Sequence, residues 1–199
     1  MRRLIIATHN RKKAGEMVQI LSARFPSLEL LTLADFDGAP EPEETGSTYQ
    51  ENANIKALSS ARFTREWSLA DDAGLEIDAL EGAPGLYSKR FGGEDLPFPE
   101  KMALILDSLR DTPEELRTAR FRCCVALAHP DEQVRLFEAT CEGRIVKEPS
   151  GAGGFGYDPI FYLPQLNCTM ADLTAEQKHE ISHRGKVLRM LGDYLESRI

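Results

Sequence analysis

The spacing of apolar residues changes from strand to helix periodicity at the start of the chain. Residues 4–8 form a short apolar, β-branched run, which predicts a strand that ends in polar residues. A helix is predicted next, because apolar residues then recur every three or four positions, at Ala14, Met17, Val18, Leu21 and Phe25. A second strand is predicted around residues 28–33. Ser47 or Thr48 can then cap a helix that runs to about residue 63, with Gln50 or Glu51 completing a capping box.

The second half of the chain predicts a hairpin and a closing helix. Residues 96–109 indicate a helix, and residues 119–128 and 134–145 indicate two strands joined by a turn at residues 130–132. The last helix carries an apolar stripe at Val187, Leu188, Leu191, Tyr194 and Leu195. Helices that alternate with strands, followed by a hairpin, favour an α/β fold with a mixed central sheet flanked by helices.

Length and charge narrow the class of protein. The 199 residues suffice for one well-buried domain, so residues 1–199 are expected to form a single domain. A net charge of −8 argues against binding of duplex nucleic acid through a basic face. No apolar run is long enough for a signal peptide or a bilayer span, so we expect a cytoplasmic protein without membrane contact. The cysteines lack CxxC spacing and are expected to be reduced core residues; they are Cys123, Cys124, Cys141 and Cys168.

The first candidate site lies where the first strand ends and the first helix begins. Backbone N–H groups and the helix dipole favour an anion at such a position, so the segment predicts a phosphate cradle. Its residues are Thr8, His9, Asn10, Arg11, Lys12 and Lys13. The alternative is an ordinary polar helix start with solvated lysines. It is not a Walker loop, because GxxxxGK[ST] is absent from the sequence.

Acidic residues form the second candidate site. Glu43 and Glu44 lie in a proline-rich loop, and Asp71 and Asp72 lie between two short apolar runs. Mg²⁺ takes oxygen ligands, usually one or two protein carboxylates completed by water and substrate phosphate. These pairs are therefore candidates for holding the metal and for orienting a water. The alternative for the aspartates is a turn with Asp caps. Lys56 either faces the same site or is a solvated surface lysine.

Two further segments have the composition of a nucleoside pocket. Glycines in residues 153–159 let the backbone approach a ligand, and Phe155 can stack on a base. The alternative is a structural turn with Phe155 in the core. Arg184, next to His183 at the start of the last helix, can donate to a carbonyl oxygen of a base, and Lys178 is close in sequence. The alternative there is a helix cap with surface charges.

Residues 179–183 also match HExxH, which on one continuous helix places two histidines on one face as zinc ligands. Ser182, followed by a new apolar stripe, indicates an N-cap, so we expect the two histidines on either side of a helix boundary. Lys186 stands where the metzincin extension requires glycine. The zinc protease interpretation is therefore disfavoured.

Five motifs follow one another along nearly the whole chain. They read ATHNRKKAGEM, EETGSTYQENANIKA, LADDAGLEIDALEGAPGLYSKRF, GGFGYDPIF and ISHRGKVL. Together they resemble the inosine triphosphate pyrophosphatases, also called non-canonical purine NTP pyrophosphatases. The resemblance implies an elongated mixed sheet with two lobes around an active-site cleft, and usually a homodimer. It also implies Mg²⁺-assisted hydrolysis of ITP, dITP or XTP to the monophosphate and pyrophosphate.

The same resemblance implies residue roles. Asp72 matches the acid that activates the attacking water, and it shares the metal site with Glu43. Lys56 and the segment from Thr8 to Lys13 would hold the triphosphate. The nucleoside pocket would comprise Phe155, Gly156, Tyr157, Asp158, Lys178, His183 and Arg184.

Two departures and two alternatives accompany the resemblance. Ala73 stands where relatives often carry a hydroxyl residue, so only its backbone can be expected to contact substrate. Either Lys89 or Arg90 could reach the substrate. One alternative function is a pyrophosphatase for pyrimidine or other modified nucleotides. The other is a nucleotide-binding protein without catalysis, against which the presence of Glu43, Asp72 and Lys13 argues.

Overall fold

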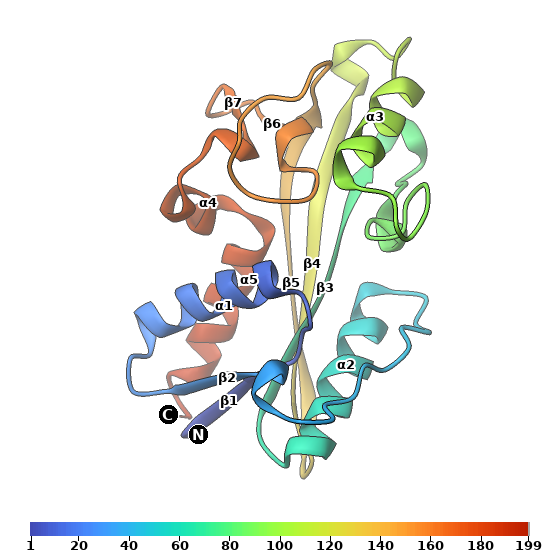
Figure 1. The fold of residues 1–199 in the computed structure, drawn as a ribbon. Coiled ribbons are helices and arrows are strands. Elements are labelled where there is room, and N and C mark those ends of the chain that lie inside the picture. The colour runs from blue at the N-terminus through green and yellow to red at the C-terminus, as the bar shows by residue number, and fades with distance from the viewer. Residues whose placement is uncertain (199) are drawn as a thin grey trace. The chain divides into compact units, whose positions relative to one another are not determined.

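The computed structural model describes residues 1–198 of the chain. Its helices and strands are arranged as in Figure 1. They are β1 (Arg3–Ile6), α1 (Arg11–Arg24), β2 (Glu29–Thr32), α2 (Tyr49–Thr64), β3 (Ser68–Ile77), α3 (Phe98–Ser108), β4 (Thr118–His129), β5 (Glu132–Ile145), β6 (Phe161–Leu163), β7 (Cys168–Thr169), α4 (Ala175–Ile181) and α5 (His183–Leu195).

The strands form one mixed sheet in the order β2-β1-β3-β4-β5-β6-β7. β1 pairs in parallel with β2 and with β3, whereas β6 pairs antiparallel with β5 and with β7. The predicted α/β class with a mixed sheet flanked by helices is confirmed, as is the hairpin of β4 and β5. The sequence did not predict β6, β7 or α4. These elements have three, two and seven residues, which are too few to display a clear periodicity.

The chain divides into two compact units. The first comprises Met1–Asp72, Cys123–Ala139 and Arg184–Ile199, of which residue 199 lies outside the described part. The second comprises Ala73–Arg122 and Thr140–His183. The single domain over residues 1–199 that the sequence indicates stays a prediction.

The core of the first unit is built from apolar stripes that the sequence displays. Apolar residues of β1, α1 and α5 are buried, and α2 contributes small residues at a four-residue spacing, which lets the helix pack closely. The buried residues of these elements include Leu4, Ile5, Ile6, Met17, Leu21, Ala53, Ala57, Ala61, Val187, Leu188, Leu191 and Leu195. Thr48 caps α2 by accepting from the Glu51 amide, while the Glu51 carboxylate accepts from the Ser47 amide. The predicted cap is thus Thr48, and the return bond of the capping box reaches one residue further back.

The core of the second unit is a cluster of aliphatic and aromatic side chains. It comprises Leu75, Ile77, Met102, Ile105, Leu109, Ala119, Phe121, Cys141, Ile145, Tyr157, Ile160, Phe161, Leu163 and Met170. None of the four cysteines forms a disulfide, as predicted. Cys123, Cys124 and Cys141 are buried, but the prediction of a core position is wrong for Cys168, which is half-buried beside the exposed turn after β6. No helix within residues 1–198 is long and apolar enough to cross a membrane.

Candidate active site

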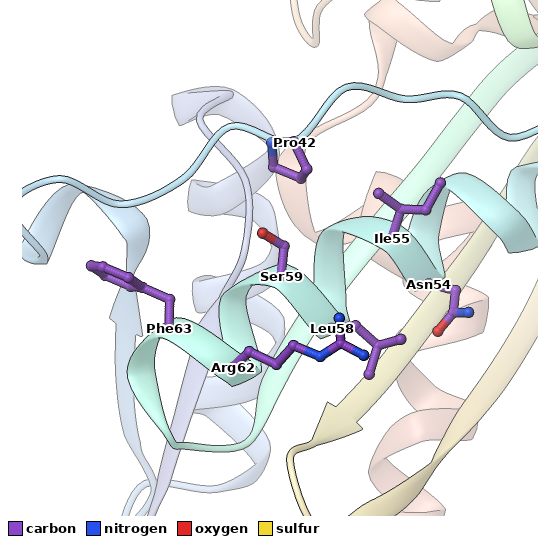
Figure 2. A pocket seen from close by; sticks show the side chains of 7 residues that line it. All are labelled: Pro42, Asn54, Ile55, Leu58, Ser59, Arg62 and Phe63. Carbon is purple, nitrogen blue, oxygen red and sulfur yellow. The ribbon is translucent and has the colours of Figure 1, made fainter.

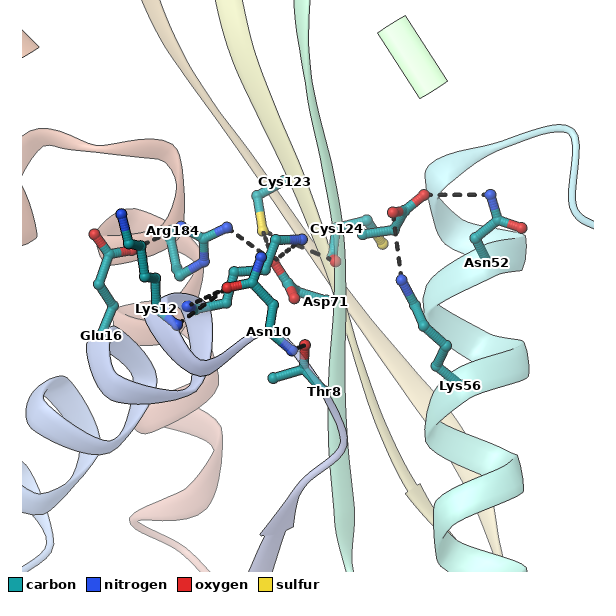
Figure 3. A network of polar contacts seen from close by, with 12 residues as sticks. Thr8, Asn10, Lys12, Glu16, Asn52, Lys56, Asp71, Cys123, Cys124 and Arg184 are labelled. Carbon is teal, nitrogen blue, oxygen red and sulfur yellow. Dashed lines mark hydrogen bonds and ion pairs between the residues drawn. The ribbon is translucent and has the colours of Figure 1, made fainter. Parts of the chain in front are cut away.

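The two aspartates of the acidic motif lie inside a single strand, β3, and not in a turn between two strands. The alternative interpretation, a turn with Asp caps, is wrong, because β3 continues through both aspartates for ten consecutive residues. Successive side chains of a strand point to opposite faces of the sheet, so Asp71 and Asp72 face different helices. In Figure 3, Arg184 and Asn10 lie on one side of β3, and Asn52 and Lys56 lie on the other.

Asp71 is fully buried and holds two cations from distant parts of the chain. Its Oδ2 accepts from the Arg184 guanidinium at 3.0 Å and lies 3.3 Å from the Lys13 ammonium. Arg184 in turn donates to the Glu16 carboxylate at 2.7 Å. Burial alone would raise the pKa of Asp71, but the positive charges of Lys13, Arg184 and Lys56 outweigh it and hold the pKa well below its usual range. Asp71 is therefore an anion that this fold stabilises.

Asp72 has the opposite electrostatic environment. Its carboxylate accepts from the Lys56 ammonium at 3.4 Å and from the Asn52 amide at 3.3 Å. Burial raises the pKa of Asp72, and the charges of Lys56 and Lys13 offset only part of this effect, while Glu44 adds to it. Its negative charge is thus incompletely compensated, which is typical of groups that accept a proton or a cation during function.

Lys56 connects Asp72 to the proline-rich loop that contains Glu43 and Glu44, which we call the acidic loop. Its ammonium lies 2.7 Å from the Glu44 carboxylate as well as 3.4 Å from Asp72. Burial lowers the pKa of Lys56, but Asp72, Asp71 and Glu44 together raise it, so this lysine keeps its charge. Glu43, in contrast, is exposed, and within residues 1–198 its carboxylate has no hydrogen bond or ion pair.

The predicted phosphate cradle begins helix α1. Asn10 is its N-cap, and its side chain accepts from the amides of Lys12 and Lys13 at 3.1 Å each. Thr8 accepts from the Asn10 amide and so orients the cap. Two amides that the sequence offered to an anion are therefore already satisfied, because a short carboxamide at an N-cap reaches them first. The exposed side chains of His9, Arg11 and Lys12 surround this turn.

Asp158 organises the predicted nucleoside loop in the second unit. Its carboxylate accepts from the Phe155 amide at 2.8 Å and from the buried Lys178 ammonium at 2.7 Å. That ammonium also lies 4.4 Å from the centroid of the Phe155 ring, a cation–π contact. A Cβ on Gly154 would stand 2.1 Å from the Asp158 carboxylate, and its φ of +68° favours glycine as well. The half-exposed Phe155 ring is therefore held on the surface of this loop and not in the core.

Three other predicted residues, Ala73, Tyr157 and His183, belong to the second unit. The Tyr157 ring belongs to the core, and its hydroxyl donates to the Ser88 carbonyl at 2.8 Å, so its side chain is engaged within the protein. His183 is buried, with its ring stacked on Phe121 at 4.8 Å between centroids. Ala73 is half-buried in β3.

A comparison with protein families decides the relationship of the chain. The Ham1 family matches residues 4–194. The chain belongs to the Ham1 family. A dITP/XTP pyrophosphatase of Halalkalibacterium halodurans is 46% identical over 196 residues, which are 98% of this chain and 100% of that protein. A dITP/XTP pyrophosphatase of Desulforamulus reducens is 46% identical over 187 residues, 94% of this chain and 92% of that protein. The structure of a HAM1 protein from Coxiella burnetii superposes with a TM-score of 0.89 at 39% identity, covering 99% and 100% of the two chains.

The zinc motif is not formed in this Ham1 chain. α4 ends at Ile181, Ser182 has an extended backbone, and α5 begins at His183. The two histidines of HExxH therefore belong to different helices, as the predicted N-cap at Ser182 required. A histidine pair on one helix face is the basis of that zinc site, so this Ham1 protein lacks its geometry.

A surface pocket of the first unit lies apart from these residues. It has a volume of about 560 Å³ and is lined by α2 and the acidic loop (Figure 2). The lining residues are Pro42, Asn54, Ile55, Leu58, Ser59, Arg62 and Phe63. None of them is a predicted site residue, and Asn52 and Lys56 leave α2 from a different face toward Asp72.

The sequence did not single out Glu16 and Asn52. Glu16 lies three residues after Lys13 on α1, and Asn52 lies four residues before Lys56 on α2, so each shares a helix face with a predicted residue. That spacing was available as a signal. Their partners, Arg184 and Asp72, are distant in the sequence, and only the tertiary structure brings them together.

Proposed function

We propose that this Ham1 protein hydrolyses inosine- and xanthosine-type nucleoside triphosphates, such as ITP, dITP and XTP, to the monophosphate and pyrophosphate. Relatives named dITP/XTP pyrophosphatase, at 46% identity over more than nine tenths of their length, support this activity. The observation that carries the proposal is Asp72. It is a buried carboxylate with a raised pKa, held by Lys56 and Asn52, and this is the environment of a general base.

In the proposed reaction, Asp72 accepts a hydrogen bond from a water and orients it toward the α-phosphorus. The water attacks, the bond to the bridging oxygen breaks, and pyrophosphate leaves while Asp72 takes up the proton. Lys13 and Lys56 would stabilise the charge on the phosphate oxygens. Each is a cation positioned by a buried aspartate of β3, Lys13 by Asp71 and Lys56 by Asp72. Asn52 would keep the Asp72 carboxylate in a single orientation.

The donor set also fits Mg²⁺. Asp72 carries incompletely compensated charge, and the exposed carboxylate of Glu43 has no partner within the described residues. No three His, Cys, Asp or Glu side chains of residues 1–198 form a metal cluster, so the protein offers only the one or two carboxylates that this ion usually takes. We propose that Glu43 and Asp72 hold it. The bound ion would neutralise phosphate oxygens and lower the pKa of a coordinated water.

We assign recognition of the base to the loop with Phe155, Gly156, Tyr157 and Asp158, together with Lys178, His183 and Arg184. Hypoxanthine and xanthine present an oxygen at position 6, whereas adenine presents an amino group, which would leave a lysine or arginine donor unpaired. Sites of this kind discriminate by roughly 10⁴-fold or more. The half-exposed Phe155 ring, held by Lys178 and Asp158, supports stacking on a purine.

Further expectations concern assembly and location. We propose one NTP pyrophosphatase domain with two lobes around a cleft, a homodimer, and a cytoplasmic protein that binds neither nucleic acid nor membranes. The net charge of −8 supports the lack of nucleic-acid binding. Light scattering of the purified protein tests the dimer.

A nucleotide panel tests the proposed function. ITP, dITP, XTP, GTP, ATP and dUTP are incubated with the protein and Mg²⁺, and pyrophosphate and orthophosphate are measured separately. Release of pyrophosphate from ITP and XTP, lost in Asp72→Asn, is expected. A preference for dUTP would favour the pyrimidine alternative, and binding without turnover would favour the silent nucleotide-binding protein. Orthophosphate as the first product would refute attack at the α-phosphorus.

A further inference from the structure

Among the residues that the structure describes, Lys101 is a buried cation without an anionic partner. It lies on α3, is only 1% exposed, and is among the largest fully buried side chains. A buried lysine normally pairs with a carboxylate, because removing its charge from water is costly. Within residues 1–198 the Lys101 ammonium instead donates to two main-chain carbonyls, of Lys89 and of Gly93, the latter at 2.8 Å. The ammonium also lies 5.8 Å from the centroid of the Phe98 ring.

Both carbonyls belong to one irregular turn, residues 88–93. Gly92 and Gly93 have φ values of +72° and +139°, which favour glycine and let the turn fold back. Because the two carbonyls point to the buried ammonium, the turn's outward side is formed by the exposed side chains of Lys89 and Arg90. Lys101 therefore supports the inner side of this turn, and the outer side carries two adjacent cations. Such a pair stands out in a protein whose net charge is −8.

A second contact ties this turn to the loop that carries Phe155. The buried Tyr157 hydroxyl donates to the Ser88 carbonyl at 2.8 Å. The Tyr157 ring packs edge-on against Phe98, at 5.2 Å between centroids, and Phe98 lies three residues before Lys101 on α3. Lys101 and Tyr157 thus hold neighbouring carbonyls of the same turn from one packed cluster.

We propose that Lys101 is a positioning residue for substrate binding: it acts as a tethered ammonium ion in a site of main-chain carbonyls and holds the cationic turn 88–93 against the Phe155 loop. The ligand of the turn is the polyanionic nucleotide, so this inference rests on the proposed function. Ordering a backbone residue costs conformational entropy, so a turn without regular structure needs such support to present its cations in one conformation.

Two substitutions test this support. Lys101→Met keeps the volume but removes the donors, and we expect it to raise the KM for ITP about tenfold while kcat changes less than about twofold, because ground-state binding is lost. Lys101→Ala removes the atoms of propylammonium, and we expect added propylammonium chloride to restore the KM. Tetramethylammonium chloride at the same concentration has no N–H donor and is expected to have no effect. The matched control is Lys147→Met, because Lys147 is exposed and is not a candidate site residue.

A mutant cycle separates positioning from general damage to the core. If Lys101 acts through the turn, adding Lys101→Met to the double variant Lys89→Ala/Arg90→Ala should raise the KM by less than about twofold further. Multiplicative effects, or no response of Lys101→Ala to propylammonium, would overturn the inference. So would a Lys101→Met protein with the KM of the wild type. An inactive wild-type protein would instead contradict the proposed function, and the two failures are thus distinguishable.

Discussion

We expect Asp71→Asn to lower the stability of the protein and Asp72→Asn to lower its activity without a loss of stability, although the two residues are adjacent in β3. Asp71 holds Arg184 and Lys13 at 3.0 and 3.3 Å in a fully buried site, so the neutral amide leaves two cations without this anion. Removing one partner of a buried ion pair costs about 3–5 kcal/mol. Because Arg184 keeps Glu16 at 2.7 Å, we expect the lower end, about 3 kcal/mol. For a protein of this size that corresponds to a fall of about 6–12 °C in Tm.

Asp72→Asn is expected to leave the protein at least as stable as the wild type near pH 7. The folded-state pKa of Asp72 is raised, so the fold favours its neutral form, and ionisation as the pH rises through that pKa costs stability. The neutral amide removes this cost, and Lys56 keeps Glu44 as its partner. The same substitution removes the proposed base, which we expect to lower kcat by about 10²–10⁴-fold.

Thermal unfolding and pyrophosphate release, measured on both variants at pH 7, test this contrast. Urea denaturation gives the free energies of unfolding independently of the heating rate. The reasoning is refuted if Asp72→Asn loses as much stability as Asp71→Asn, or if Asp71→Asn unfolds at the wild-type temperature. Either result would mean that the charges around β3 do not act on the two carboxylates in opposite directions.

Three further outcomes are expected. Glu43→Gln should raise the Mg²⁺ concentration for half-maximal rate by about 10–100-fold, and Glu44→Gln, whose carboxylate is engaged by Lys56, should raise it less; equal effects would contradict the proposed ligand choice. Lys178→Met should lower kcat/KM for ITP about 10²-fold or more, and kcat/KM for ATP by less, so that the ratio of the two values falls. An unchanged ratio would exclude Lys178 from base recognition. A thiol reagent should modify Cys168 first in the native protein, faster as the pH rises, because its raised pKa limits the thiolate at neutral pH; the three buried cysteines should react only on unfolding.

Local patterns in the sequence determined most of the fold. β1, α1, the β4–β5 hairpin and α5 follow from apolar periodicity, and the break at Ser182 follows from its capping chemistry. These features depend on residues within a few positions of one another, so a linear sequence displays them. For the same reason the motif residues that lie close in sequence, such as Phe155 and Asp158, could be grouped into one loop from their spacing.

The tertiary structure alone decided what each charged residue does. The sequence shows Asp71 and Asp72 as an equivalent pair, but the continuous strand sends them to opposite faces, where one meets Arg184 and the other Lys56. It likewise contains no sign that Lys101 is a buried cation on two carbonyls. Pairing and burial of this kind depend on segments that pack together from distant parts of the chain, and a pKa follows from those neighbours and from desolvation, neither of which has a local sequence pattern.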